Sequence, residues 1–161
     1  MAGEKPRVVF DCNVYVQALV NSNSAAARCL DLTRRGRVEA FISQQTLAEL
    51  KEVLQRPNVL RLLPHATSEQ IEAFLEDVIA VSTRIRHIPA RFDFERDPKD
   101  EPYINLAIAA DADYIVSRDK DLLDLMTGHT KECKEFRQRF RPLRVIEPQE
   151  FLIIILPVKE K

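Results

Sequence analysis

Short apolar runs alternate with longer amphipathic segments along almost the whole chain, and this alternation restricts the possible folds more than any other feature. The runs are rich in β-branched and aromatic residues, which favours buried strands, while the segments between them have helical periodicity. Strands that alternate with helices predict a parallel sheet with helices on both faces. We expect strands at 7–11, 38–42, 84–88, 114–117 and 143–146, and helices at 14–20, 25–35, 44–55, 68–79, 101–110, 122–126 and 131–140.

Local signals support the ends of several of these helices. Ser24 and Ser43 are suitable N-caps, and Thr67 with Gln70 has the spacing of a capping box. Gly36 stands where a helix that begins after Ser24 would be closed. The helix boundaries therefore rest on capping chemistry as well as on periodicity.

The length of 161 residues fits one domain, which we expect to span residues 1–161. Its core should lie at about 7–151, followed by an apolar C-terminal tail at 152–161. A hydrophobic content of 45% with 30% charged residues is ordinary for a soluble globular protein. The longest uninterrupted apolar run, 151–157, is far too short to span a bilayer.

Glycine, histidine and cysteine are scarce in this chain, and their number and spacing exclude several kinds of site. Three glycines in the whole chain leave no room for a P-loop or a G-x-G-x-x-G dinucleotide motif. The three histidines, His65, His87 and His129, form no zinc-ligand spacing. The three cysteines have no C-x-x-C spacing and no signal peptide precedes them, so we expect a reducing, cytoplasmic location without disulfides.

Acidic residues stand at strand ends or in the helices beside them at separate places in the chain. Asp11 ends the first predicted strand, and Asp119 follows the strand at 114–117. Asp100 precedes the helix at 101–110, and Glu49 lies six residues into the helix that begins after Ser43. In an open parallel sheet, ligands bind outside the carboxyl ends of the strands. If the strands are adjacent, these four acids converge at that edge.

Four converging carboxylates need positive charge, because like charges raise one another's pKa or move apart. Ligation by oxygen alone, without histidine or cysteine, favours Mg²⁺ or Mn²⁺ over zinc. Such a cation can polarise a phosphodiester and activate a water for attack. The chemistry that fits is metal-dependent phosphodiester hydrolysis.

Each acid also has a purely structural interpretation, which the spacing leaves open. Asp11, Asp100 and Asp119 could each cap the helix that follows, since Asp is a favoured N-cap. Glu49 could be a solvated helix residue, although it sits next to Leu50 and close to the buried face. The functional interpretation depends on all four acids meeting at one place.

At these residues the chain resembles the PIN-domain ribonucleases, from Val8 to about Phe151. It is most similar to the branch that contains toxins of toxin–antitoxin systems. The segments that carry the resemblance are VFDCNV at 9–14, SQQTLAEL at 43–50, DPKDEPYINLA at 97–107 and ADYIVSRDKDLL at 112–123.

The resemblance implies a three-layer α/β/α sandwich with a central, mostly parallel sheet and a Mg²⁺- or Mn²⁺-dependent endoribonuclease site. By position, the implied metal-binding acids are Asp11, Glu49, Asp100 and Asp119, with Asp121 as an accessory acid. Two further matches are Asn13, two residues after the first acid, and Ser117, two before the last strand acid; we expect both to contact substrate.

The chain departs from the family pattern at two places. Asp97, Asp100 and Glu101 compete for the role of third acid; Asp100 is preferred because it lies seven residues before Ala107. Cys12 replaces a commoner small hydroxyl residue, and we expect a small buried side chain there rather than a reactive thiol.

The basic residues are scattered, and most should lie on solvated faces. The net charge of −1 becomes +3 once four acids are taken up by a cation site, so the surface that meets RNA can be mildly positive. Arg118 and Lys120 flank Asp119 and are the best candidates for phosphate contacts.

The apolar segment 151–156 would promote aggregation if it were exposed. It should be buried either against the domain or in an interface with an antitoxin or a second copy, and a homo-oligomer such as a dimer is expected. The rival to the enzyme hypothesis is a PIN-like scaffold that binds RNA or a protein partner with little or no catalysis.

Overall fold

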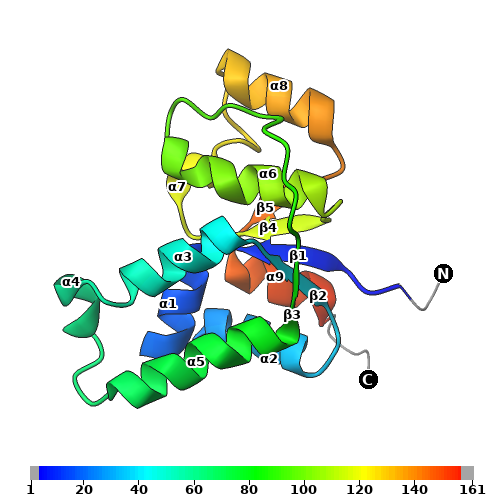
Figure 1. Ribbon diagram of the computed structural model, residues 1–161. Helices are drawn as coiled ribbons and strands as arrows, with labels where there is room; N and C mark the ends of the chain where they lie inside the picture. The colour runs from blue at the N-terminus through cyan, green and yellow to red at the C-terminus, as the bar shows by residue number, and fades with distance from the viewer. Residues whose placement is uncertain (1–3, 157–161) are drawn as a thin grey trace.

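Five parallel strands form the centre of the molecule in the computed structural model, which describes residues 4–156 (Figure 1). The strands are β1 (Arg7–Phe10), β2 (Glu39–Ile42), β3 (Ser82–Arg84), β4 (Tyr114–Val116) and β5 (Arg144–Ile146). Their order across the sheet is β3–β2–β1–β4–β5, and every neighbouring pair runs parallel. The predicted parallel sheet is confirmed.

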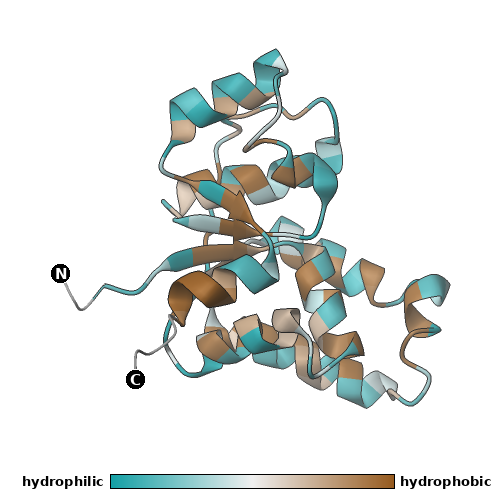
Figure 2. Ribbon diagram, turned by 180° about the vertical axis from the view of Figure 1, so that it is seen from behind, coloured by the Kyte–Doolittle hydropathy of each residue, from teal (hydrophilic) through white to brown (hydrophobic). Residues whose placement is uncertain are grey.

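Helices cover both faces of this sheet, which confirms the predicted three-layer α/β/α architecture (Figures 1 and 2). They are α1 (Cys12–Val20), α2 (Ala25–Arg34), α3 (Gln44–Val53), α4 (Pro57–Leu60), α5 (Ser68–Val81), α6 (Glu101–Ala109), α7 (Lys120–Leu123), α8 (Lys131–Phe140) and α9 (Pro148–Ile155), with a 3₁₀ turn η1 (Pro98–Asp100). On one face α6 packs on β1, β2 and β4, and α8 lies beyond it. On the other face α2 packs against both α1 and α9.

The register of the two central strands determines what emerges at the carboxyl edge of the sheet. Val9 lies opposite Ile115, and Phe10 lies opposite Val116. One residue further on, the backbone N–H of Asp11 donates to the carbonyl of Val116 at 2.9 Å. Asp11 and Ser117 therefore leave the sheet side by side.

The strand predicted at 84–88 is wrong in its position. The structure places β3 at Ser82–Arg84, and α5 runs directly into it. β3 ends at Arg84 because its partner strand β2 ends at Ile42, which lies opposite Arg84. Beyond that point a single further backbone bond, from Ile85 N to Ile42 O at 2.9 Å, continues the contact.

The apolar segment predicted as a tail is helical in the structure. Residues 148–155 form α9, with Pro148 in the first turn, where its missing N–H costs nothing. Phe151 is fully buried and packs edge-on against Phe10, with ring centroids 6.0 Å apart. Ile153 is 67% exposed, because the helical turn carries it to the other side. Residues 157–161 of the expected tail lie outside the described residues.

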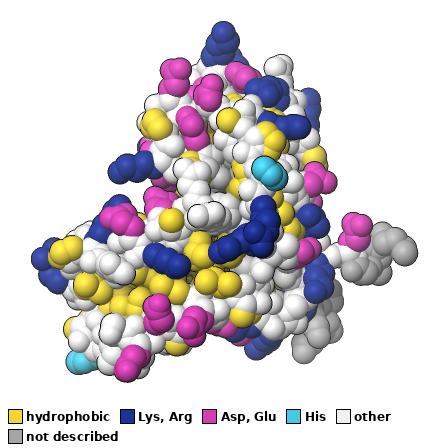
Figure 3. Space-filling model, in the orientation of Figure 1, with side chains coloured by type: hydrophobic (Ala, Val, Ile, Leu, Met, Phe, Trp, Pro, Cys, Tyr) yellow, Lys and Arg dark blue, Asp and Glu magenta, His cyan; other side chains and the backbone are white. Residues whose placement is uncertain are grey.

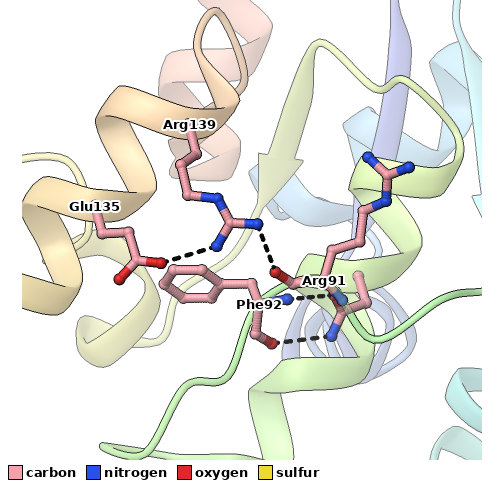
Figure 4. Close-up of polar contacts among 5 residues, drawn as sticks. Arg91, Phe92, Glu135 and Arg139 are labelled. Carbon is pink, nitrogen blue, oxygen red and sulfur yellow. Dashed lines mark hydrogen bonds and ion pairs between the residues drawn. The ribbon is translucent and has the colours of Figure 1, made fainter.

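The segment between β3 and η1 is fixed by a buried asparagine of α6, Asn105. Its Oδ1 accepts from the backbone N–H groups of Arg91 and Phe92 at 2.8 and 3.0 Å, and its Nδ2 donates to the Phe92 carbonyl at 3.1 Å. Arg139 of α8 donates to the Arg91 carbonyl at 3.0 Å and to Glu135 at 2.8 Å (Figure 4). The loop that leads into the acidic stretch is thus held to two helices.

Candidate metal centre

Asp11 sits at the carboxyl end of β1 and is held there by several donors. Its Oδ1 accepts from the backbone N–H of Cys12 at 2.7 Å, so it does cap α1. Its Oδ2 accepts from the Ser117 hydroxyl at 2.7 Å and from the Asn13 amide at 3.3 Å. Only 4% of the residue is exposed. The side chain therefore caps a helix and also has a fixed orientation in a buried site.

Asp119 comes from the loop that follows β4 and is oriented by the same serine. Its backbone N–H donates to the Ser117 hydroxyl at 2.9 Å, and its Oδ1 accepts from the Asp121 N–H at 2.9 Å, which caps α7. Ser117 is fully buried and so connects Asp11 with the loop that carries Asp119.

Asp100 ends η1 and begins α6, yet its side chain makes no capping hydrogen bond. It is 5% exposed, and its Oδ2 has no hydrogen-bond partner within residues 4–156. A buried carboxylate oxygen without a partner is costly, because desolvation is not compensated. The capping interpretation does not account for this side chain, and a bound cation would.

The three aspartates converge. Asp11, Asp100 and Asp119 each offer a carboxylate oxygen, and these atoms lie within 4.8 Å of one another. They open into a cleft of about 340 Å³ whose lining includes Glu49 and Lys99. The strand order makes this possible, since β1 and β4 are neighbours and η1 approaches the same edge.

The electrostatics of the cluster favour a cation. Burial raises the pKa of Asp11 to about 6, and the negative charges of Asp119 and Glu49 add to this effect against the hydrogen bonds from Ser117 and Cys12. Burial, then the charge of Asp11, then the neighbouring Asp119 hold the pKa of Asp100 well above its usual range. A divalent ion would reduce the repulsion between the carboxylates and would give the Asp100 Oδ2 atom a partner. Three oxygen ligands suit a hard cation. The residues fit such an ion.

Glu49 faces the same cleft from α3 but lies outside the aspartate triplet. It is half-buried, and its Oε1 accepts a hydrogen bond from the Tyr103 hydroxyl of α6. Burial holds the pKa of Tyr103 far above its ordinary value, so this hydroxyl remains a donor.

The three candidates for the third acid differ in what their side chains contact. Asp100 joins Asp11 and Asp119, whereas Glu101 accepts from the backbone N–H of Phe94 at 2.8 Å. Asp97 caps η1 through Lys99 N at 3.2 Å.

Asp97 forms a second acidic group with Asp119 and Asp121, whose ligand atoms also lie within 4.8 Å of one another. In that group Asp121 pairs with Arg96 at 2.6 Å. Arg96 therefore neutralises part of the charge of Asp121, the expected accessory acid.

The polar residues expected to meet substrate lie close to the acids. Asn13 and Ser117 both donate to Asp11, and Asn13 Oδ1 accepts from the Arg118 N–H at 3.2 Å. The Arg118 guanidinium is exposed and donates to Gln17 at 2.8 Å, and Lys120 is exposed at the start of α7. In the structure Asn13 and Ser117 orient a carboxylate, while Arg118 and Lys120 remain open to solvent.

Cys12 lies beside the cluster and is 8% exposed. Burial, together with Glu49 and Asp11, raises the pKa of its thiol to about 12. It therefore stays protonated near neutral pH and behaves as a small buried side chain.

Three residues that shape the site are not among those predicted from the sequence: Tyr103, Asn105 and Arg96. Asn105 carries a detectable signal, since an asparagine on the buried face of an otherwise apolar helix needs several partners. Tyr103 contacts Glu49, which is 54 residues away in the sequence, and Arg96 contacts Asp121, which is 25 residues away. No local sequence pattern indicates either of these partners.

The metal-free protein is expected to lose stability as the pH rises from about 4 to 6. The raised pKa means that folded Asp11 holds its proton where the unfolded chain has released it, so the free energy of unfolding falls with pH in this window. A shift of about two pKa units corresponds to about 3 kcal/mol. The raised pKa of Asp100 extends the fall in the free energy of unfolding to higher pH.

This pH dependence is measured by urea unfolding in EDTA, as the difference between wild type and Asp11→Asn. The subtraction removes the contribution of the surface carboxylates. A difference that does not change between pH 4 and 6 would contradict the buried, desolvated state of Asp11.

A family model described as a PIN domain matches residues 7–121. The match runs from β1 into α7 and contains all three clustered aspartates and Glu49. It excludes α8, β5 and α9.

Two known proteins are similar to this chain over nearly its whole length. The uncharacterized protein MJ1680 of Methanocaldococcus jannaschii is 30% identical over 148 residues, which are 92% of this chain and 90% of that protein. The crystal structure of PAE2754 from Pyrobaculum aerophilum has a TM-score of 0.58 at 16% identity, covering 93% of this chain and 89% of that one. The structural likeness supports the fold alone.

No helix among residues 4–156 combines the length and the apolar character needed to cross a membrane.

Proposed function

The chain belongs to the PIN-domain family, and from this premise we propose that it is a Mg²⁺- or Mn²⁺-dependent endoribonuclease that hydrolyses RNA phosphodiester bonds. PIN domains are generally metal-dependent nucleases. The observation that carries the proposal is the convergence of Asp11, Asp100 and Asp119, one of them with a buried oxygen that has no partner within residues 4–156.

In this proposal the three aspartates would hold the cation, with Glu49 of α3 lining the same cleft. When bound, the cation supplies Lewis-acid activation of the phosphodiester and lowers the pKa of water. Ser117 and Asn13 keep the Asp11 carboxylate turned toward the cleft, and Ser117 also anchors the loop of Asp119. Arg118 and Lys120, at the rim, are placed to contact phosphates of the RNA.

The experiment is cleavage of a labelled single-stranded RNA by the purified protein, with Mn²⁺ and with EDTA. Cleavage that needs the metal and is lost in Asp119→Asn supports the proposal. A protein that binds RNA and Mn²⁺ without cutting would instead be the scaffold of the alternative hypothesis.

We also propose that the protein is the toxin of a toxin–antitoxin pair, acting on cytoplasmic RNA and assembling with an antitoxin or as a dimer. The support is the family resemblance of the four motif segments. Induced expression should arrest growth, and Asp119→Asn should not. Growth that continues under active wild-type enzyme would contradict the toxin role and leave the nuclease role intact.

Arg118→Gln is expected to weaken RNA binding without removing metal binding. On the face shown in Figure 3, basic and acidic side chains are interspersed, so individual cations beside the cleft should matter more than a broad positive field. Loss of one phosphate contact lowers the slope of log affinity against log salt by about 0.7 for single-stranded RNA. Fluorescence anisotropy across a salt series measures this slope.

The matched control is Arg37→Gln. Arg37 is exposed, makes no ion pair with a described residue and precedes β2, at the opposite edge of the sheet. Equal slopes for the two variants would exclude Arg118 from the RNA contact.

A further inference from the structure

Tyr103 occupies a place that connects two sides of the cleft. It lies in α6, three residues after Asp100, and is 2% exposed. Its hydroxyl donates to Oε1 of Glu49 on α3, and α3 and α6 pack against each other. The bond therefore joins the helix that starts beside Asp100 to the helix that presents Glu49.

We propose that Tyr103 is a positioning residue that holds the Glu49 carboxylate in the orientation needed to bind the cation. The inference rests on the metal centre of the proposed function. It gives a role to a residue of the segment 97–107 other than the acids that the family resemblance implies.

The geometry of the carboxylate supports this role. The Tyr103 bond is the one hydrogen bond that the Glu49 carboxylate receives from the described residues. A phenol has one proton to donate, so it occupies Oε1 and leaves Oε2 without a hydrogen bond from the described residues. Without the bond, a half-exposed glutamate would be free to sample other rotamers, and fixing it again would oppose binding through lost side-chain entropy.

Tyr103 also differs from a tyrosine that merely fills the core. Tyr15 of α1 is 5% exposed, and its hydroxyl is buried without a hydrogen-bond partner within residues 4–156. Tyr15 is therefore a buried tyrosine whose hydroxyl makes no hydrogen bond to the carboxylates of the cleft. The Tyr103 hydroxyl instead meets a carboxylate that lines the cleft with Asp11, Asp100 and Asp119.

The test is Mn²⁺ affinity, measured by isothermal titration and by the electron paramagnetic resonance signal of free Mn²⁺, without RNA. Tyr103→Phe retains the ring and removes only the hydroxyl. Partners that orient metal ligands typically contribute 10–100-fold to metal affinity, so we expect a loss of about tenfold. Tyr15→Phe, the matched control, should bind Mn²⁺ within about twofold of wild type.

A double-mutant cycle separates positioning from a general structural effect. In Glu49→Gln the carboxylate is already lost, so adding Tyr103→Phe should not lower Mn²⁺ affinity further. An additive loss, or a Tyr103→Phe variant that binds Mn²⁺ as wild type does, would overturn the positioning role. If Tyr103→Phe melts much lower than wild type, the comparison of Glu49→Gln with the double variant at a temperature where both are folded gives the same decision.

The readout also separates this inference from the proposed function. A wild-type protein that binds Mn²⁺ but cuts no RNA would refute the nuclease proposal, and the Tyr103 cycle would still be measured. A wild-type protein that binds no Mn²⁺ would overturn both.

Discussion

Asp119→Asn is expected to abolish Mn²⁺-dependent RNA cleavage and to weaken Mn²⁺ binding, with the fold unchanged. Asp119 belongs to both acidic groups at the carboxyl edge, so its loss removes a ligand from each of them. Changes in outer partners of a metal site already cost 10–100-fold in affinity or activity, and removing a ligand charge should exceed about 100-fold. Asparagine is as good an N-cap as aspartate, so α7 should keep its start.

The measurement is the cleavage rate over a Mn²⁺ titration, together with the melting temperature in EDTA. Asp31→Asn is the matched control, because Asp31 makes an exposed i,i+4 pair with Arg35, which contributes at most about 1 kcal/mol. It should cut RNA at the wild-type rate. Retained cleavage in Asp119→Asn would remove this residue from the site.

Asp100→Asn is expected to change stability in opposite directions with and without metal. In EDTA the variant should melt higher than wild type, because it removes a buried carboxylate whose ionised form is disfavoured by burial and by the charge of Asp11. In millimolar Mn²⁺ the order should reverse, since a ligand that binds only the native state raises the melting temperature.

Thermal melting of wild type and Asp100→Asn in EDTA and across a Mn²⁺ series tests this reversal in the order of their melting temperatures. A structural aspartate would give a variant that is less stable under both conditions, as expected when a needed hydrogen bond is lost. That result would contradict the assignment of Asp100 to a cation site.

The architecture could be predicted because the alternation of strands and helices is a local property of the sequence. The predicted strands at 7–11, 38–42 and 114–117 agree closely with β1, β2 and β4, whose buried residues are apolar on both faces. The strand predicted at 84–88 differs from β3 because β3 is an exposed edge strand, where pairing with β2 rather than hydrophobicity sets its limits. The tail at 151–156 has no helical periodicity of its own, since apolar residues occupy every position and only packing on Phe10 distinguishes its faces.

The four acids could be found from their positions relative to strands, but their roles depend on contacts between distant segments. The Ser117–Asp11 bond joins residues that are 106 positions apart, and it makes Ser117 a support for the acid. Burial of Asp100 and the turning of Glu101 toward Phe94 separate neighbours that look equivalent in sequence. Tyr103 could not be assigned in advance, because its partner lies on another helix.

A divalent cation held by the three aspartates is the feature on which the proposed function depends most directly. A crystal structure of the protein soaked in Mn²⁺, with anomalous differences recorded at the manganese edge, tests it. The predicted result is an anomalous peak about 2.1 Å from carboxylate oxygens of Asp11, Asp100 and Asp119. A map with no peak at these oxygens, at Mn²⁺ concentrations that support RNA cleavage, would contradict it.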